Sequence, residues 1–281
     1  MKGYMYLVLS FLVLALTIGV AMVVDNVLVT NAILLAFIIS WIAFIPAYIF
    51  QTEKFYDLTG TIKYLTLVWF VYFSSNSLGV FNIGNFILAI LISIWTIRLG
   101  SFLFLRIHKD GEDKRFRTIK ISPSQFFFAW TTSGMWVSLC SMCALTAISS
   151  SSGVIMNTTT YIGILIFMFG FIFEVIADRQ KTIFRSNRDN KDKFITSGLW
   201  SISRHPNYFG EVMLWLGISV ISFSSLNGSE YISLISPIFT YLLLVYVSGV
   251  RMLEDRSDKK WGDSEDYIKY KKNTPIFFPK F

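Results

Sequence analysis

The segment 201–211, SISRHPNYFGE, places a group of polar and ionisable side chains at the start of an otherwise apolar stretch. Proline lacks the N–H that a helix leaves unpaired in its first turn, so Pro206 favours a helix that begins there. The residue before a proline is biased toward an extended conformation, which places His205 outside the helix. Since a helix N-terminus presents free N–H groups and the positive end of the helix dipole, Arg204 and His205 mark a place that favours an anion.

The side chains that follow share one face of this helix. From a start at Pro206, helical spacing aligns Asn207, Tyr208, Glu211 and Trp215. This face is polar near the helix start and apolar farther along. A carboxylate more than one turn inside an apolar segment has an unfavourable desolvation free energy. Glu211 therefore favours a functional site over an ordinary helix start at a membrane interface.

A second polar stripe lies in FEVIADRQKTIFR, where Glu174, Asp178, Lys181 and Arg185 follow one another at helical spacing. Two cations one turn apart repel each other unless an anion lies between them. Lys181 and Arg185 therefore indicate either a bound anion or contact with lipid headgroups. Arg98, in a separate apolar segment, either pairs with one of these carboxylates or extends toward the membrane surface.

Other chemistries find little support in the residue pattern. No two glycines stand two positions apart, so the glycine fingerprint of the dinucleotide-binding α/β fold is absent. His108 and His205 are the two histidines, and no serine stands in a nucleophile-elbow context. No cluster of His, Cys and carboxylates has the spacing of a metal site. Cys140 and Cys143 lie inside an apolar segment, which favours packing over redox or zinc chemistry.

The elements that position these residues must lie in a membrane. The chain has 281 residues, of which 54% are hydrophobic and 15% charged, with a mean hydropathy of +0.56. This composition predicts an all-α, polytopic membrane helical bundle. With a window of about 20 residues, the candidate spans are 5–24, 32–50, 62–81, 85–107, 124–148, 159–178, 207–226 and 231–250.

The count of spans is seven or eight, because one of them is weak. The 62–81 segment contains Ser74, Ser75, Asn76 and Ser77, which suit a broken or re-entrant segment. The first stretch has no small-residue cleavage pattern and is interpreted as a retained signal-anchor.

Charge predicts the orientation. With eight spans and a cytosolic N-terminus, all Lys and Arg residues except Arg98 lie on the cytosolic side. They are Lys2 and the basic residues of the segments 51–63, 106–120, 179–204 and 251–281. The C-terminus is then cytosolic. The sequons at Asn157 and Asn227 fall on the opposite side and favour the endoplasmic reticulum. The net charge of +7 is explained either by membrane topology and contact with anionic lipids or by a phosphate-bearing cofactor. Because the sequence contains no soluble basic domain, the charge does not indicate nucleic-acid binding.

Several segments together resemble the steroid 5α-reductase superfamily, namely the C-terminal domain of the 3-oxo-5-alpha-steroid 4-dehydrogenases and a large branch similar to it. The resemblance covers roughly 55–281 and rests on the order and spacing of GLWSISRHPNYFGE (198–211), FYDLTG (55–60), IRLGSFLFLRI (97–107), FEVIADRQKTIFR (173–185) and EDRSDKKWGDSEDYIKYKKNTPIFFP (254–279). Isoprenylcysteine and phospholipid methyltransferases share a segment similar to the R-H-P-x-Y-x-G core.

The resemblance implies two domains, N-terminal transmembrane helices over 1–54 and a reductase-like membrane domain over 55–281. It also implies a pocket for NADPH on the cytosolic side. By position, Lys181 and Arg185 would contact the adenosine phosphate, with Arg204 and the helix start at the diphosphate and Asn207 at the nicotinamide carboxamide. The remaining matched or neighbouring cofactor positions are Asp178, Trp200, His205, Tyr208, Glu254, Tyr267 and Tyr270.

The catalytic positions depart from the family pattern. Steroid-reducing members use a Tyr, assisted by a Glu, to hydrogen-bond the substrate carbonyl, and Trp95 stands at the Tyr position here. The catalytic candidates are therefore Trp95, Asn207, Tyr208 and Glu211, with Tyr56, Asp57, Tyr64 and Tyr72 as weaker candidates for the electrophile.

These features predict an NADPH-dependent reductase that transfers hydride to the C=C bond of a lipid or steroid-like enone or alkene, acting as a monomer. One alternative is a methyltransferase that uses S-adenosylmethionine on a membrane lipid or a prenylated cysteine. The other is a non-catalytic lipid-binding relative that retains the fold.

Overall fold

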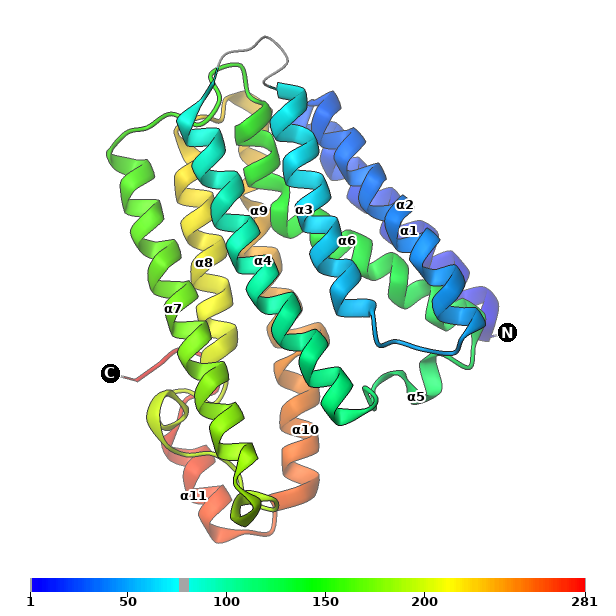
Figure 1. Cartoon of the computed structure of the whole chain (residues 1–281), viewed down its shortest axis with the longest axis vertical. Coiled ribbons are helices and arrows are strands. Elements are labelled where there is room, and N and C mark those ends of the chain that lie inside the picture. The colour runs from blue at the N-terminus through cyan, green and yellow to red at the C-terminus, as the bar shows by residue number, and fades with distance from the viewer. Residues whose placement is uncertain (1, 76–80, 281) are drawn as a thin grey trace. The chain divides into compact units, whose positions relative to one another are not determined.

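The computed structural model describes residues 2–75 and 81–280. Every regular element in those two ranges is helical, which confirms the expected all-α class (Figure 1). Asn76 and Ser77, which weakened the expected span 62–81, lie outside the described residues.

The chain forms two compact units. The first unit comprises Met1–Thr160 and Ile221–Ser236, and the second comprises Tyr161–Val220 and Pro237–Phe281. The division at residue 54 expected from the sequence stays a prediction. The helices up to residue 149 are α1 (Lys2–Val24), α2 (Val27–Ile49), α3 (Tyr56–Ser75), α4 (Ile83–Asp110), α5 (Phe116–Ile119) and α6 (Pro123–Ser149).

Six helical segments in the described residues are long and apolar enough to cross a membrane: α1, α2, α4, α6, α7 (Thr158–Ser186) and the run Gly228–Trp261. They correspond to six of the eight expected spans. The other two expected spans, 62–81 and 207–226, overlap α3 and α8 (Pro206–Phe223), which are not among the six. The charges of Asp57 and Lys63 in α3 and the polar start of α8 lower their apolar character.

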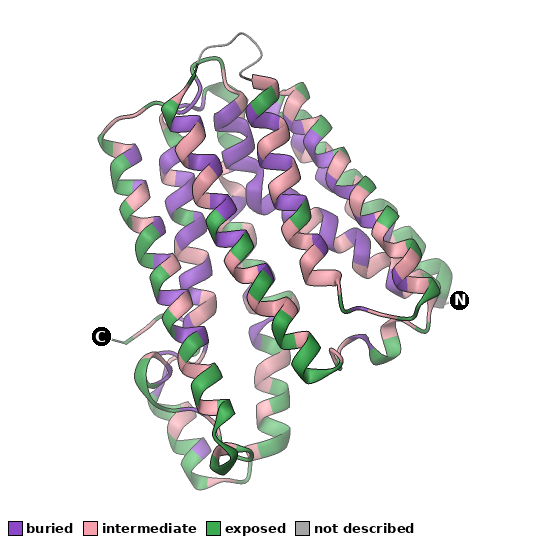
Figure 2. Ribbon diagram, in the orientation of Figure 1, coloured by how far each residue is buried: buried purple, intermediate pink, exposed green. Residues whose placement is uncertain are grey.

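The first unit is organised around α6, which packs against α1, α2 and α3. Most of α6 is buried, as Figure 2 shows in purple. Cys140 and Cys143 lie in its buried interior.

Lys63 is an ionisable residue in the core of the first unit. Its side chain is fully buried, and its Nζ donates to Ser40 Oγ at 2.9 Å and to Ser133 Oγ at 2.6 Å. The Ser40 hydroxyl in turn donates to the Ala36 carbonyl at 2.9 Å. Hydroxyl groups from α2 and α6 thus satisfy a buried amine of α3.

In the second unit, α7 and α8 run side by side and approach each other closely through glycines. A Cβ atom on Gly170 would lie 2.6 Å from the Gly210 oxygen, one on Gly210 would lie 2.6 Å from the Glu174 nitrogen, and one on Gly217 would lie 2.4 Å from the Phe167 nitrogen. Because a side chain fits at none of these points, glycine lets the two backbones touch. The contacts fix the register between the two helices that carry most of the motif residues.

The last segment long enough to cross a membrane is not one continuous α-helix. Gly228–Trp261 consists of a 3₁₀ helix (Gly228–Leu234), α9 (Ile235–Leu242), a π-helical turn (Leu243–Ser248) and α10 (Val250–Trp261). A Cβ on Gly249 would lie 2.4 Å from the Leu244 oxygen and 2.9 Å from a Tyr208 ring carbon. The expected span 231–250 is therefore broken where Tyr208 approaches, and π turns of this kind often lie at functional sites.

The chain end folds back on the motif. After α11 (Glu265–Asn273), the Arg204 amide donates to the Pro275 carbonyl at 2.9 Å, and the Lys280 amide donates to the Ile202 carbonyl at 2.9 Å. The C-terminal segment thereby holds the residues that precede α8.

Candidate cofactor-binding site

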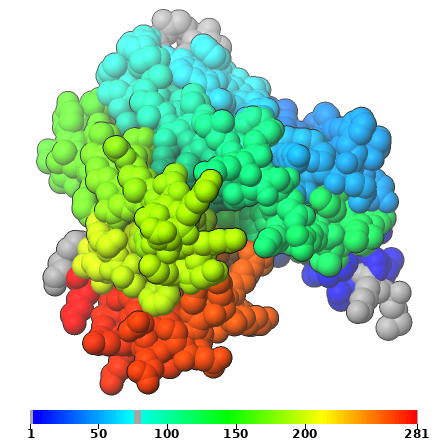
Figure 3. All heavy atoms as spheres, turned by 60° about the horizontal axis from the view of Figure 1, so that its bottom comes forward, coloured from blue at the N-terminus to red at the C-terminus, as the bar shows by residue number. Residues whose placement is uncertain are grey.

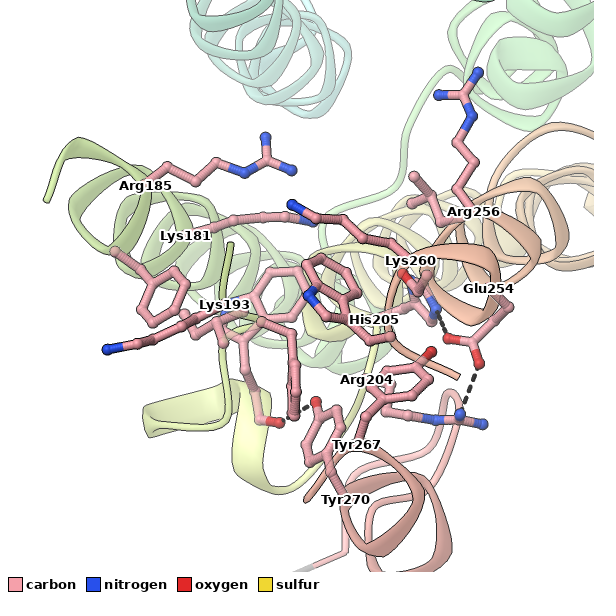
Figure 4. Close-up of a pocket in the computed structure, with 17 residues that line it drawn as sticks. Lys181, Arg185, Lys193, Arg204, His205, Glu254, Arg256, Lys260, Tyr267 and Tyr270 are labelled. Carbon is pink, nitrogen blue, oxygen red and sulfur yellow. Dashed lines mark hydrogen bonds and ion pairs between the residues drawn. The ribbon is translucent and has the colours of Figure 1, made fainter. Parts of the chain in front are cut away.

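A pocket of about 300 Å³ lies within the second unit. Its walls come from the C-terminal part of α7, the segment 193–205, α10 and α11 (Figure 4). Six cationic side chains line it: Lys181, Arg185, Lys193, Arg204, Arg256 and Lys260. Such a concentration of positive charge favours an anionic ligand.

α7 contributes the paired cations. The helix continues to Ser186, beyond the expected span end at 178, so Lys181 and Arg185 lie one turn apart on one continuous helix and both line the pocket. Lys181 Nζ lies 4.3 Å from the centre of the Trp200 ring, a cation–π contact.

Trp200 is held in the pocket wall by hydrogen bonds that join two segments. Its Nε1 donates to the Ala177 carbonyl at 3.0 Å, and the ring is 3% exposed. The 3₁₀ turn Gly198–Ser201 begins at a positive φ of 62° at Gly198, where the Gln180 side chain packs closely. Gln180 Oε1 accepts from the Leu199 amide at 2.9 Å. Gln180 thus fixes the turn that presents Trp200.

Glu254 joins the motif to α10. Its carboxylate lies 2.6 Å from Arg204 Nη1 and 2.8 Å from His205 Nε2, as the dashed lines in Figure 4 show. Lys271 Nζ is 3.7 Å away. Burial lowers the pKa of His205, although the hydrogen bond to Glu254 raises it. Neutral His205 then donates through Nε2 to the carboxylate.

Two tyrosines of α11 close the pocket. The Tyr267 hydroxyl donates to Asp258 Oδ1 at 3.0 Å, and the Tyr270 hydroxyl donates to the Trp200 carbonyl at 2.6 Å. Burial raises the pKa of both hydroxyls. The Asp258 and Glu254 carboxylates raise the pKa of Tyr267 further, whereas Arg204 opposes the increase at Tyr270, and both hydroxyls stay protonated donors.

Eight of the cofactor residues expected from the sequence line this one pocket: Lys181, Arg185, Trp200, Arg204, His205, Glu254, Tyr267 and Tyr270. Asp178, Asn207, Tyr208 and Glu211 are not among the lining residues. They follow the pocket along the α7–α8 contact, where Asn207 Nδ2 lies 3.2 Å from Asp178 Oδ1.

Tyr208 connects that row to the pocket. Its ring stacks on His205 with the ring centres 5.8 Å apart and the planes 7° from parallel. Glu211 lies farther along α8 and is 8% exposed, and Glu174 on the facing helix is 2% exposed. A buried polar row therefore continues from His205 along α8.

The electrophile candidates lie in the first unit. Trp95 is 1% exposed and packs edge-on against Tyr64, with the ring centres 5.1 Å apart. The Tyr56 hydroxyl donates to the Ala129 carbonyl at 2.9 Å, and Tyr72 is 7% exposed. Arg98 lies over the Phe102 ring, 5.4 Å from its centre.

Nine lining residues were not singled out from the sequence: Phe184, Lys193, Phe194, Ile195, Leu253, Arg256, Ser257, Lys260 and Trp261. Four of them, Arg256, Ser257, Lys260 and Trp261, lie in the EDRSDKKW stretch at the end of α10, where basic and acidic residues are mixed. Such a mixture is typical of a solvent-exposed helix end, and the spacing of its residues does not indicate a binding site.

The residues present fit a ligand that is both phosphorylated and aromatic. Cations surround the pocket, and Phe194, Trp200, Trp261, Tyr267 and Tyr270 supply aromatic rings to its walls. Among the described residues, Arg204 Nε and His205 Nδ1 are buried polar atoms without a hydrogen-bond partner. In native proteins such buried atoms usually bind a partner, a water molecule or a ligand.

The chain is similar in sequence to several known proteins. Residues 43–274 match the family described as "Protein of unknown function (DUF1295)". The probable O-methyltransferase ustE of Ustilaginoidea virens is 30% identical over 115 residues, which are 36% of this chain and 40% of that protein. No solved structure matches the chain.

Two reductases are also similar over shorter segments. The Delta(14)-sterol reductase of Arabidopsis thaliana is 32% identical over 93 residues, which are 29% of this chain and 24% of that protein. The steroid 5-alpha-reductase DET2 of Gossypium hirsutum is 37% identical over 62 residues, which are 22% of this chain and 24% of that protein. The chain thus spans less than half the length of these three relatives.

Proposed function

Because the chain belongs to the DUF1295 family and is distantly related to sterol and steroid reductases, we propose that it is a membrane NADPH-dependent reductase. Its substrate would be a lipid or steroid-like molecule with a C=C bond, either an enone or an alkene. The electron source would be bound in the basic pocket of the second unit.

One observation carries the proposal: Lys181 and Arg185 lie one helical turn apart in a pocket that has four further cations and aromatic walls. A 2′-phosphate bound by Lys181 and Arg185 would accept charge-assisted hydrogen bonds from both side chains. NADH has no such phosphate, so this pair is a reason to prefer NADPH.

The other residues have roles that follow from their places. Arg204 and the start of α8 suit a diphosphate, with Glu254 orienting the guanidinium at 2.6 Å. Asn207, which pairs with Asp178 at 3.2 Å, presents a side-chain amide that suits the nicotinamide carboxamide. When bound, NADPH supplies the hydride, and the protein supplies position and polarisation.

The membrane setting supports a lipid substrate. Six apolar helices make the chain an integral membrane protein, and two relatives carry the names of a sterol reductase and a steroid reductase. We extend the proposal to a monomer in the endoplasmic reticulum with its C-terminus in the cytosol. Tyr208 and Glu211 then belong to the catalytic region, and Trp95 is the proposed donor to a substrate carbonyl.

The match to the probable O-methyltransferase keeps a second candidate function, methyl transfer from S-adenosylmethionine. That cofactor contains a sulfonium cation and has no phosphate. A pocket lined by six cationic side chains would repel the sulfonium and leave the Lys181–Arg185 pair without a role. The charge of the site therefore favours the reductase.

A nucleotide-binding experiment tests the proposal. The full chain, purified in detergent, would be titrated with NADPH, NADH and S-adenosylmethionine while its thermal midpoint is followed. A ligand at about 100 times its Kd stabilises the folded state by about 2.7 kcal/mol, so a real ligand gives a clear upward shift. We expect the largest shift with NADPH.

The other outcomes identify the alternatives. A shift with S-adenosylmethionine and none with NADPH would favour the methyltransferase. No shift with any of the three would favour the non-catalytic lipid-binding relative. Reduced-nicotinamide absorbance that co-purifies with the chain would be independent support for the reductase.

A further inference from the structure

The segment that follows α7 is fastened to the end of α10. Lys260 Nζ lies 3.1 Å from Asp192 Oδ1 and 3.4 Å from the Lys191 carbonyl. Trp261 Nε1 donates to the Asp192 carbonyl at 2.7 Å. In Figure 3 the yellow-green surface of this segment lies beside the orange and red surface of α10 and α11. We name residues 191–194 the strap.

The strap forms part of the pocket. Lys193 and Phe194 line it together with Lys260 and Trp261, the two residues that hold the strap. The Phe194 ring packs against Trp261 and Tyr267, with the ring centres 5.7 Å and 5.1 Å apart. Anything that changes the hold of Lys260 on Asp192 therefore also changes a wall of the pocket.

The Lys260–Asp192 pair is weak because it is exposed. The Lys260 side chain is 46% exposed and the Asp192 side chain is 84% exposed, and ion pairs of this kind contribute little to stability. A phosphate group carries more negative charge and more acceptor oxygens than a carboxylate. A phosphate in the pocket would thus outcompete Asp192 for the same ammonium group.

We propose that Asp192 competes with a ligand phosphate for Lys260, so that phosphate binding in the pocket breaks the contact between Lys260 and the strap, while the Trp261 hydrogen bond to the Asp192 carbonyl remains. This inference rests on the proposed binding of a phosphorylated cofactor. It gives Lys260 a role in cofactor affinity and makes Asp192 an internal inhibitor of binding.

Opposite effects of two substitutions test the competition. Equilibrium dissociation constants of NADPH and of 2′,5′-ADP would be measured on the full chain in detergent. We expect Lys260→Gln to weaken both ligands about tenfold, because it removes one charge-assisted contact. We expect Asp192→Asn to tighten both about two- to fivefold, the range set by the loss of an exposed ion pair.

Two matched controls separate the competition from general electrostatics. Asp189→Asn removes a negative charge from the 3₁₀ helix Arg188–Asn190 just before the strap, and Lys259→Gln removes a positive charge from the neighbouring position of α10. Both residues are exposed and neither lines the pocket. We expect each to change affinity by less than about twofold. In the Lys260→Gln background, Asp192→Asn should have no further effect.

The possible failures differ. Suppose that wild-type protein binds NADPH, but Asp192→Asn leaves the affinity unchanged, weakens it, or has the same effect in the Lys260→Gln background. The proposed competition is then wrong, and the cofactor assignment stands. If wild-type protein binds neither NADPH nor 2′,5′-ADP, the cofactor assignment and the inference both fail.

Discussion

Gly210 of α8 lies directly against the backbone of Glu174 in α7, so close that a Cβ atom on Gly210 would be 2.6 Å from the Glu174 nitrogen. One turn away in the same register, the Asn207 amide meets the Asp178 carboxylate at 3.2 Å. The glycine contact therefore sets the distance at which the polar groups of the two helices meet.

A side chain at Gly210 should separate the helices. Gly210→Ala is expected to destabilise the protein by about 1–3 kcal/mol, the usual effect of overpacking, and to weaken NADPH binding by disturbing Asp178 and Asn207. Thermal denaturation and nucleotide titration would measure both effects. Gly60→Ala is the control, because a Cβ at Gly60 has no heavy atom within 4 Å. A Gly210→Ala variant as stable as Gly60→Ala would contradict the packing argument.

The paired cations of α7 should distinguish the two nicotinamide cofactors. Lys181→Ala or Arg185→Ala is expected to weaken NADPH about 10- to 100-fold, the range for a lost hydrogen bond between charged partners. NADH binding should change much less, since NADH lacks the 2′-phosphate. Equal losses for the two cofactors, measured as Kd ratios, would show that the pair does not contact this phosphate.

The state of His205 should appear in the pH dependence of stability. Because burial lowers its pKa below the usual value of about 6.5, the unfolded chain takes up a proton that the folded chain does not. The stability that neutral His205 contributes is therefore present above about pH 6.5 and is lost as the pH falls. Glu254 opposes this shift, while nearby Lys181 and Arg204 add to it.

Thermal midpoints of wild type and His205→Gln between about pH 8 and pH 5 would measure this effect. Gln can still donate to Glu254 but does not titrate. We expect a smaller decrease in the midpoint of the variant as the pH falls. Parallel profiles would mean that His205 does not contribute the predicted dependence.

Lys63 offers a test in the first unit. Its amine is fully buried and has two hydroxyl acceptors, Ser40 and Ser133. Lys63→Met should leave the thermal midpoint unchanged or raise it, because an amine that is costly to desolvate is replaced by an apolar chain of similar length. Ser133→Ala should destabilise by about 1–3 kcal/mol, since it leaves the amine without one acceptor. If Lys63→Met is well folded but inactive, the residue serves function rather than packing.

The sequence predicted the fold class, and eight of its candidate residues line one pocket. Pro206 begins α8 at the expected position, and helical spacing brought Lys181 and Arg185 to one face. Lys193 and Lys260 escaped prediction because folding alone brings them to the same pocket, where Trp261 Nε1 donates to the Asp192 carbonyl, 69 positions away in the chain. Nor could spacing reveal the break at Gly249, where the Tyr208 ring lies close to the backbone.

The return of the chain end to the motif has a practical consequence. Ser203 Oγ donates to the Phe277 carbonyl at 2.8 Å, and the Arg204 and Lys280 amides complete a short two-sided seam. A purification tag or fluorescent reporter fused at the carboxyl end would begin next to the residues that position Arg204. Placing such additions at the amino end avoids that seam, and activity lost in a carboxyl-terminal fusion would reflect a displaced backbone rather than altered chemistry.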